Sequence, residues 1–350
     1  MDGSPVRATV AAFRGGLPNV ELRYAVKANR DPVLLRALAD SGLGFALWSR
    51  QDLGALRVVG IDLERIHLTH PRPGLALLER ARDAGVRLFT IDSLGTLARL
   101  ACIQPGTGVL IRVHLTHDSA ALRFPYRHGI DLHKLGDLWR ATERAGLVPR
   151  GIAVHLGSQV QNSRAWESVG DLIESVQEWL PATSVINLGG GLPVRYADGG
   201  ASWEAHIDAI SAQVGRWHRT GGHFILEPGR ALVAESGWLV TRVERVGRHG
   251  GRRLLVLNVS SSTGLGEAPL GIRYRVVGPQ PCVELLPTLL AGPEGYLRDP
   301  LGSQLLPQSI RARDWIAFAG AGAYTTALLS GDKSIPVLWA DISPSGAFSG

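Results

Sequence analysis

Lysine is nearly absent from this sequence. Of its 37 Lys and Arg residues only three are lysines, at positions 27, 134 and 333, and the rest are arginines. A lysine amine can form a Schiff base with a carbonyl compound, whereas an arginine guanidinium cannot. Because this chain uses arginine wherever a plain cation suffices, the retained Lys27, which ends an apolar run, is the first candidate for chemistry.

Cysteines and long apolar runs are also scarce. Cys102 and Cys282 are too few for a disulfide framework. No stretch reaches the ~20 uninterrupted apolar residues that a membrane span needs. Residues 1–5 have neither the basic flank nor the apolar core of a signal peptide. These features predict a cytoplasmic protein without a membrane partner.

The chain is basic, with a net charge of +6 and a pI near 9.7. Its longest basic clusters, 245–253 and 311–313, are short, interrupted and free of the interleaved aromatic residues that stack on bases. We therefore expect a solvated surface and no nucleic-acid partner. The positive field would suit an anionic cofactor and substrate.

Short apolar runs of β type alternate with segments of helical period between about residues 20 and 230. The apolar runs are Leu22–Ala28, Phe45–Trp48, Ile66–Thr69, Leu88–Ile91, Val109–Val113, Gly151–His155, Ser184–Leu188 and His223–Glu227. Helical segments such as Pro32–Ser41, Gly74–Ala84, Asp131–Ala145 and Trp203–Arg219 separate them, and Gly42, Gly85 and Gly146 are expected to end helices. Eight such units predict an α/β fold, a closed (β/α)8 TIM barrel over residues 1–238.

From about Leu239 the apolar runs are divided by Gly and Pro. The candidate strands are Val243, Leu254–Val259, Tyr274–Val277, Val283–Leu290, Asp314–Ala319 and Ile335–Ala340. We therefore expect an all-β domain over residues 239–350.

Polar and titratable residues stand where the predicted barrel strands end. They are Lys27, Ser49, His70, Asp92, His114, His155, Gly189 and Glu227. Barrel enzymes place their chemistry at this end of the strands, where desolvation would lower the pKa of Lys27 and free its amine. A surface lysine at a strand end is the alternative, and the pattern alone does not separate the two.

Two turns after late strands suggest a site for an anionic heterocycle. Gly189–Gly191 could close backbone N–H groups around a phosphate, although a flexible turn is the alternative. Glu227 could hold a ring nitrogen protonated and Arg230 could bind a phosphate, or the two could form a surface ion pair.

Two further motifs carry site candidates. His155 could stack on a flat ring while Ser158 reaches a phosphate, but a lone histidine is more often structural. In residues 320–324, Gly-Ala-Gly-Ala-Tyr, small side chains allow close approach and the Tyr324 phenol could donate to a phosphate. A tight packing turn is an equally good interpretation.

Taken in order, five motifs resemble those of the fold-type III pyridoxal-phosphate (PLP) decarboxylases, the ornithine, arginine and diaminopimelate decarboxylase family. They are YAVKAN at 24–29, HLGSQ at 155–159, LGGGLP at 188–193, EPGR at 227–230 and GAGAY at 320–324. No single motif would suffice, but together they extend the resemblance over nearly the whole chain.

The resemblance implies a role for each motif. Lys27 would carry PLP as a Schiff base, His155 would stack on its ring and Glu227 would pair with the ring nitrogen. The phosphate would be held by Ser158, Gly190, Gly191, Arg230 and Tyr324. A substrate amine would displace Lys27, and loss of CO2 would leave a carbanion delocalised into the ring as a quinonoid. Family members work as homodimers whose β domains complete each other's active sites.

One family motif, Gly-Pro-x-Cys with an acidic residue and then an Asp, is altered here. The alignment that keeps the spacing is 292–299, where Gly295 replaces the Cys, Tyr296 replaces the acid and Asp299 remains as a catalytic candidate. The competing alignment at 278–282 keeps Cys282 but puts Leu286 where the Asp belongs. A buried structural thiol is the alternative for Cys282.

Other departures bear on the outcome of the reaction. Ala46 stands where the family usually has Asp, and the N-terminal strand that joins the β domain is missing or very short. Without a cysteine acid, decarboxylation coupled to deamination stays open, whereas Glu227 argues against racemisation. Tyr296 argues against a free diamino acid with a distal ammonium group.

The leading interpretation is a PLP-dependent carboxy-lyase that acts on an amino acid or a carrier-linked amino acid, with no metal. The contrasting class is a non-catalytic homologue that binds partners through the old dimer surface. The retained Lys27, Glu227, Arg230 and triple glycine argue against that class.

Overall fold

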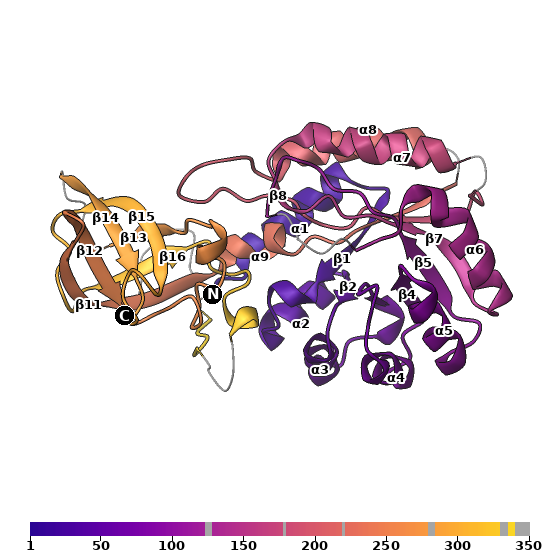
Figure 1. Cartoon of the computed structure of the whole chain (residues 1–350), viewed down its shortest axis with the longest axis horizontal. Helices are drawn as coiled ribbons and strands as arrows, with labels where there is room; N and C mark the ends of the chain where they lie inside the picture. The colour runs from indigo at the N-terminus through magenta and orange to yellow at the C-terminus, as the bar shows by residue number, and fades with distance from the viewer. Residues whose placement is uncertain (123–127, 178–179, 219–220, 279–283, 330–334, 340–350) are drawn as a thin grey trace. The chain divides into compact units, whose positions relative to one another are not determined.

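The computed structural model describes residues 1–122, 128–177, 180–218, 221–278, 284–329 and 335–339 (Figure 1). The chain divides into two compact units. Residues 9–193 and 201–229 form the barrel unit, whereas residues 1–8, 194–200 and 230–350 form the second unit. The second unit therefore includes two short segments that precede its main part in the sequence.

Eight parallel strands close into a barrel in the order β1-β10-β9-β7-β5-β4-β3-β2. They are β1 (Val20–Ala25), β2 (Gly44–Leu47), β3 (Ile66–Leu68), β4 (Leu88–Ile91), β5 (Gly108–Arg112), β7 (Val148–Ala153), β9 (Val185–Asn187) and β10 (His223–Leu226). Each predicted apolar run supplies one strand, so the predicted (β/α)8 barrel is confirmed. Every residue of β2 is buried, as expected of parallel strands that are covered on both faces.

Helices cover the outside of the strands, as Figure 1 shows for α2 to α6. The helices are α1 (Ser4–Gly16), α2 (Pro32–Asp40), α3 (Arg50–Val59), α4 (Leu75–Asp83), α5 (Leu94–Ile103), α6 (Leu135–Arg144), α7 (Glu167–Val176), α8 (Glu204–His218) and α9 (Arg230–Val233). In α6 the buried residues Leu135, Leu138, Trp139 and Thr142 recur at helical spacing, which gives the helix one apolar face toward the strands. Within the described part of the chain, no helix is both long enough and apolar enough to cross a membrane.

Turn chemistry fixes where several helices begin and end. Gly42, Gly85 and Gly146 have φ angles of 78°, 80° and 74°. Each follows the last turn of a helix in a left-handed conformation that a residue with a Cβ adopts only at a cost. At the start of α3, Ser49 and Asp52 cap each other's backbone N–H groups in a capping box.

The second unit contains a six-stranded sheet in the order β13-β16-β11-β12-β14-β15. Its strands are β11 (Trp238–His249), β12 (Arg252–Leu257), β13 (Arg275–Val277), β14 (Leu285–Ala291), β15 (Pro300–Pro307) and β16 (Trp315–Ala319). Neighbours pair antiparallel except for β12 and β14, which are parallel. The predicted fold class, a barrel with a separate β-rich domain, is confirmed.

One strand prediction for the second unit is wrong, and one strand was missed. A strand was expected at 335–340, but residues 335–339 form no strand, and Pro336 removes a ladder donor from this run. The strand β15 was not predicted, because Pro300, Gly302 and Pro307 have the composition of turns. It lies at the edge of the sheet, which is where proline is tolerated.

Candidate active site at the barrel mouth

Lys27 lies two residues past β1, in the short helix η1 (Val26–Ala28). Burial lowers the pKa of its amine, and the positive charge of Arg112 lowers it further, while Glu227 and Asp52 act in the opposite direction. The Lys27 Nζ lies 4.4 Å from the centroid of the Trp48 ring. The site therefore favours the neutral amine, which is the form that attacks a carbonyl.

Glu227 directly follows β10. Its Oε1 accepts a hydrogen bond from Asn187 Nδ2 at 2.7 Å and lies 3.4 Å from His67 Nδ1. Burial alone would raise the pKa of Glu227, but His67, Asn187 and the charge of Lys27 lower it below its usual value. Glu227 is therefore an ionised carboxylate, held by one side chain from β3 and one from β9.

The partners of Glu227 are themselves fixed. Burial lowers the pKa of His67, and its Nε2 lies 2.8 Å from Thr90 Oγ1. A neutral imidazole with its proton on Nδ1 satisfies both neighbours, since the hydroxyl can donate to Nε2. The Oδ1 of Asn187 accepts the Gly189 N–H at 2.8 Å, so its NH2 group must face Glu227.

The loop Gly189–Gly191 follows β9 and has no room for side chains. A Cβ on these three residues would lie 2.3 Å from Val154 O, 2.5 Å from Glu227 O and 2.1 Å from Gly157 O, respectively. The first and third glycines also have φ angles of 69° and 98°. Only glycine allows backbone to approach backbone this closely.

A second loop lies beside the triple glycine. The Val160 N–H donates to Gly191 O at 3.0 Å, and Val160 ends the short strand β8 (Ser158–Val160), which pairs with β6 (Ala120–Leu122). Ser158 is the first residue of β8. The predicted phosphate ligands Ser158, Gly190 and Gly191 therefore lie on two loops joined by a hydrogen bond.

His155 lies two residues past β7. Its Nδ1 accepts the Gly157 N–H at 3.0 Å. Burial, followed by the charges of Arg112 and Lys27, lowers the pKa of His155 to about 3. The imidazole is therefore neutral near pH 7 with its proton on Nε2, and an uncharged flat ring suits stacking on a heterocycle.

Arg112 ends β5 and brings a second positive charge to the mouth. Burial lowers its pKa, while Glu227 and Asp92 counteract this. Among the described residues its guanidinium has no hydrogen-bond or ion-pair partner. Asp92 is engaged elsewhere, since Arg72 Nε lies 2.8 and 3.0 Å from its two oxygens and the Gly129 N–H donates to it at 2.9 Å.

Trp48, His70 and His128 form an aromatic cluster next to Lys27. Their ring centroids lie 4.3 Å (Trp48–His70), 5.6 Å (Trp48–His128) and 6.1 Å (His70–His128) apart. Burial, then His128 and Lys27, lowers the pKa of His70 to about 4. Burial and Arg112 lower the pKa of His128, so both imidazoles are neutral near pH 7.

Two predicted rim residues have contacts with backbone groups. Ser49 caps α3, and His114 Nδ1 lies 3.4 Å from the backbone oxygen of His128.

Arg230 and Tyr324 belong to the second unit. Arg230 makes a two-pronged ion pair with Glu267, with Nη1 2.6 Å from Oε2, and also donates to the Tyr196 hydroxyl at 2.8 Å. Its guanidinium carbon lies 4.7 Å from the Tyr324 ring centroid. Burial opposes its charge, but Tyr196 and Glu267 raise the pKa of Arg230 above its ordinary value. Within the described chain, its Nε is the nitrogen without a hydrogen-bond partner.

Asp299 directly precedes β15 in the second unit. Its side chain is buried, and its Oδ1 accepts the Ser261 N–H at 3.0 Å. Its Oδ2 has no hydrogen-bond partner in the described part of the chain. One carboxylate oxygen of this predicted catalytic residue is therefore left unsatisfied.

The rest of the altered motif lies close to the sheet of the same unit. Tyr296 packs on an apolar cluster that consists of Leu254, Val256, Leu289 and Ala291. Gly295 has a φ angle of 80°, and a Cβ there would meet no heavy atom within 4 Å. Cys282, on which the competing alignment depends, lies outside the described residues.

Sequence reasoning did not single out Trp48, His67, Arg112 and Asn187. His67, Arg112 and Asn187 lie within or at the end of apolar barrel strands. A polar residue in such a run needs a buried partner, and this was the signal that could have identified them. Trp48 gave no signal, because it looked like one more apolar strand residue.

Comparison with known proteins places the chain among enzymes. A lysine/ornithine decarboxylase of Selenomonas ruminantium is 27% identical over 323 residues, which cover 90% of this chain and 81% of that protein. A diaminopimelate decarboxylase of Actinosynnema pretiosum subsp. auranticum is 28% identical over 354 residues, covering 96% and 81%.

Solved structures agree with these sequence matches. The crystal structure of lysine decarboxylase from Selenomonas ruminantium has a TM-score of 0.85 at 25% identity and covers 94% of this chain and 87% of that chain. Another, described as SrLDC in complex with PLP and cadaverine, has a TM-score of 0.84 at 25% identity and covers 94% and 85%.

A family model covers most of the barrel unit. The model described as "Pyridoxal-dependent decarboxylase, pyridoxal binding domain" matches residues 4–234, which is more than half of the chain. With the relatives above, this makes PLP the cofactor and amino-acid decarboxylation the family reaction. The chain belongs to the pyridoxal-dependent decarboxylases.

Proposed function

We propose that this protein removes the α-carboxyl group of an amino acid, with Lys27, His155, Glu227 and Asp299 as its catalytic residues. One observation carries the proposal. The barrel mouth holds an amine whose pKa is lowered and an ionised, hydrogen-bonded carboxylate, Lys27 and Glu227. Perturbed groups of opposite kind in one mouth are typical of a working acid–base site.

The residues at the mouth fit PLP. A Cβ at any position of the Gly189–Gly191 loop would clash with neighbouring backbone. The loop therefore has no side chains that would keep an anion from its backbone N–H groups. The neutral amine of Lys27 suits attachment of an aldehyde. When bound, PLP supplies an electron sink for the electrons that the departing carboxyl group leaves behind.

The chain's own residues then have separate tasks. Glu227 would keep a proton at the ring nitrogen of bound PLP, since Asn187 and His67 hold its carboxylate ionised and oriented. His155 would stack on the ring as a neutral imidazole. Lys27 would hold the cofactor, and its amine would be the group placed to move a proton at the substrate Cα.

From the resemblance to the family, we propose that Ser158, Gly190, Gly191, Arg230 and Tyr324 hold the phosphate. Glu267 and Tyr196 accept hydrogen bonds from the Nη atoms of Arg230, whereas its buried Nε has no hydrogen-bond partner among the described residues and is available to donate to a phosphate oxygen. Charge-assisted donors of this kind are strong.

We further propose a cytoplasmic homodimer in which Asp299 serves the partner's active site. Support comes from the resemblance to family dimers and from the unsatisfied Oδ2 of Asp299. Mixing an inactive Lys27→Ala protein with an inactive Asp299→Ala protein tests this, because a shared site would regenerate up to about a quarter of the wild-type activity. Mixtures without activity in a dimeric protein would refute the shared site.

The main test compares Lys27→Ala with Lys134→Ala. Lys134 is an exposed lysine beside Asp131, so its loss should leave a visible cofactor band that borohydride removes, together with CO2 release from amino acids. The Lys27 variant should show neither. A colourless wild-type protein, or equal behaviour of the two variants, would refute the proposal.

A further inference from the structure

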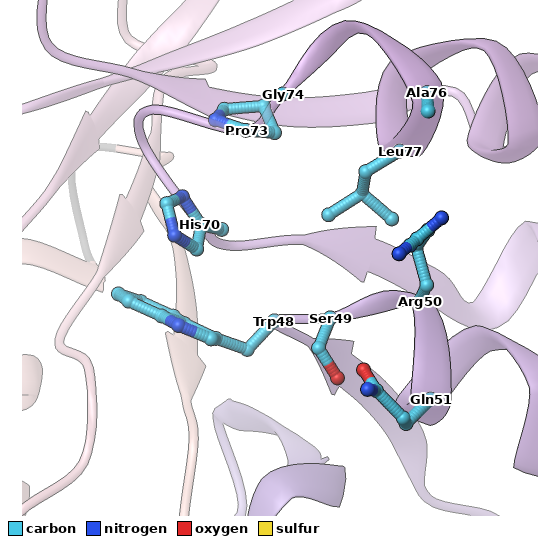
Figure 2. A pocket seen from close by; sticks show the side chains of 9 residues that line it. All are labelled: Trp48, Ser49, Arg50, Gln51, His70, Pro73, Gly74, Ala76 and Leu77. Atoms are coloured by element: carbon cyan, nitrogen blue, oxygen red, sulfur yellow. The ribbon is translucent and has the colours of Figure 1, made fainter.

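Two histidines of the same barrel segment differ in what they can reach. His70, two residues past β3, is partly exposed and lines a pocket of about 510 Å³, where its ring lies against Trp48 (Figure 2). His67 belongs to β3 itself, and its exposed fraction is 0%. A ligand in the pocket cannot touch His67 in this arrangement. Any effect of His67 on the reaction must therefore pass through the side chains that it contacts.

The ring nitrogens of His67 face polar side chains from β4, from β9 and from the end of β10. Nε2 lies 2.8 Å from Thr90 Oγ1, whereas Nδ1 lies 3.4 Å from Glu227 Oε1 and 3.5 Å from Asn187 Nδ2. Asn187 Nδ2 donates to the same Glu227 oxygen at 2.7 Å. Two nitrogens therefore converge on Oε1, and a buried imidazole needs polar partners of this kind to offset the loss of water.

The Glu227 carboxylate determines which nitrogen of His67 carries the proton. The Thr90 hydroxyl can donate or accept, so it fits either tautomer. With the proton on Nδ1, an N–H group faces Oε1, whereas with the proton on Nε2 a lone pair would face a buried negative charge. The low dielectric of the barrel core strengthens both the attraction and the repulsion. The Nδ1–H tautomer and the charged carboxylate therefore stabilise each other.

The charges around this pair keep His67 neutral. Burial lowers the pKa of His67 and outweighs the opposing effect of Glu227. Burial also raises the pKa of Glu227, but His67 counteracts it, followed by Asn187 and Lys27. The other titratable groups that act on His67 or face Glu227 are Glu21, Arg23, Arg112 and His155. Glu21 and Arg23 form an ion pair and shift the pKa of His67 in opposite directions. His67 is therefore an N–H donor to Glu227 and not a second cation.

We propose that His67 is a positioning residue whose Nδ1–H group keeps Glu227 in its charged form, so that a proton between Glu227 and the ring nitrogen of bound PLP would lie on the nitrogen. The inference rests on the proposed function, because it concerns that ring nitrogen. A shared proton resides on the group with the higher proton affinity, and each donor to Oε1 lowers the affinity of the carboxylate. A protonated ring is the stronger electron sink.

The first test needs no cofactor. In cofactor-free protein with 15N-labelled histidine and 13C-carboxyl-labelled glutamate, NMR measures the tautomer of His67 and the pKa of Glu227. His67→Leu removes the N–H group, whereas His67→Asn keeps an N–H donor at the place of Nδ1. The signals that disappear in His67→Leu and in Glu227→Gln identify the two residues. The matched control is His206→Leu, since His206 is also fully buried, has a pKa lowered by burial to about 4, and accepts a hydrogen bond from Trp166 Nε1 at 2.9 Å.

The wild-type protein should carry the His67 proton on Nδ1, a measurement that does not depend on whether a variant folds. His67→Leu should raise the pKa of Glu227, His67→Asn should return it toward the wild-type value, and His206→Leu should leave it unchanged. A proton on Nε2 in wild type, or the same Glu227 pKa in wild type and His67→Leu, would overturn the inference.

The second test uses the holoenzyme and the amino acid from which wild type releases CO2 fastest. His67→Leu should lower kcat about tenfold and change KM by less than about twofold, because His67 does not touch the substrate. His67→Asn should recover most of the lost kcat, and equal losses in the two variants would show that His67 only fills space. A protein without a cofactor band and without CO2 release would instead refute the proposed function.

Discussion

The barrel mouth and the Arg230 cluster of the second unit both bury charge, yet they treat it in opposite ways. The Nη atoms of Arg230 donate hydrogen bonds to the Glu267 carboxylate and the Tyr196 hydroxyl. At the mouth, Arg112 has no direct partner among the described residues, and Lys27 is pushed toward its neutral form. A guanidinium whose Nη atoms are bonded to partners mainly supports its own unit and keeps its Nε for a ligand, whereas a guanidinium without partners can direct all of its donors to a ligand.

The largest expected effect is on stability, from Glu267→Gln. It leaves the Arg230 guanidinium buried without its counter-ion, which costs about 3–5 kcal/mol of unfolding free energy. The midpoint of urea unfolding measures this. Replacing both partners, with Arg230→Met and Glu267→Leu, should recover part of the loss, and a Glu267→Gln protein as stable as wild type would erase the contrast between the two clusters.

Glu227→Gln should lower activity and leave stability nearly unchanged. The substitution keeps the shape and the Asn187 contact, so the unfolding midpoint should change little, but kcat should fall about 100-fold or more because the ring nitrogen loses its acid–base partner. Glu21→Gln is the control, since Glu21 pairs with Arg23 and His223 at the other end of the barrel. A similar kcat for wild type and Glu227→Gln would contradict the assignment.

Lys27→Met should stabilise the cofactor-free protein. The folded-state pKa of Lys27 lies below that of the unfolded chain, so the unfolded chain binds an extra proton between the two values. Wild-type stability is therefore reduced as pH falls below ~10.4, and the variant lacks this dependence. Thermal unfolding at several pH values should show a Tm gain, about 2–4 °C for each kcal/mol, that grows toward lower pH. A gain that is independent of pH would point to packing instead of charge.

The smallest effect is expected from Gly295→Cys. The Cβ would meet nothing within 4 Å, so the cost should be limited to the left-handed backbone, about 1–2 kcal/mol. If 292–299 is the family motif, the variant should also release more amine relative to any deaminated product, as product analysis by mass would show. An unchanged product ratio would favour the alignment through Cys282.

The barrel was predictable because its strands are buried on both faces and form short continuous apolar runs. The ends of the strands could also be located in the sequence, so Lys27, His155 and Glu227 could be proposed as site residues before any geometry was known. The edge strand β15 was missed since its Pro and Gly residues have the composition of a turn, and the run at 335–339 has the apolar content of a strand without forming one.

What the sequence could not predict is how side chains from different strands meet. His67 and Asn187 are 120 positions apart, and both reach Glu227 only because β3 and β9 belong to one closed barrel. The lack of a partner for Arg112 is likewise a property of the assembled mouth. Spacing along the chain contains neither fact.

The Asn187 side chain connects the glycine loop to Glu227. One end of its amide is held by the Gly189 N–H of the glycine loop, and the other end donates to Glu227. Any displacement of that loop must turn the amide and weaken the donor that keeps the carboxylate ionised. Anion binding at the loop and proton affinity at Glu227 are therefore linked reciprocally, so that removing the phosphate from the cofactor would alter the acid–base behaviour of a carboxylate that the phosphate itself does not touch.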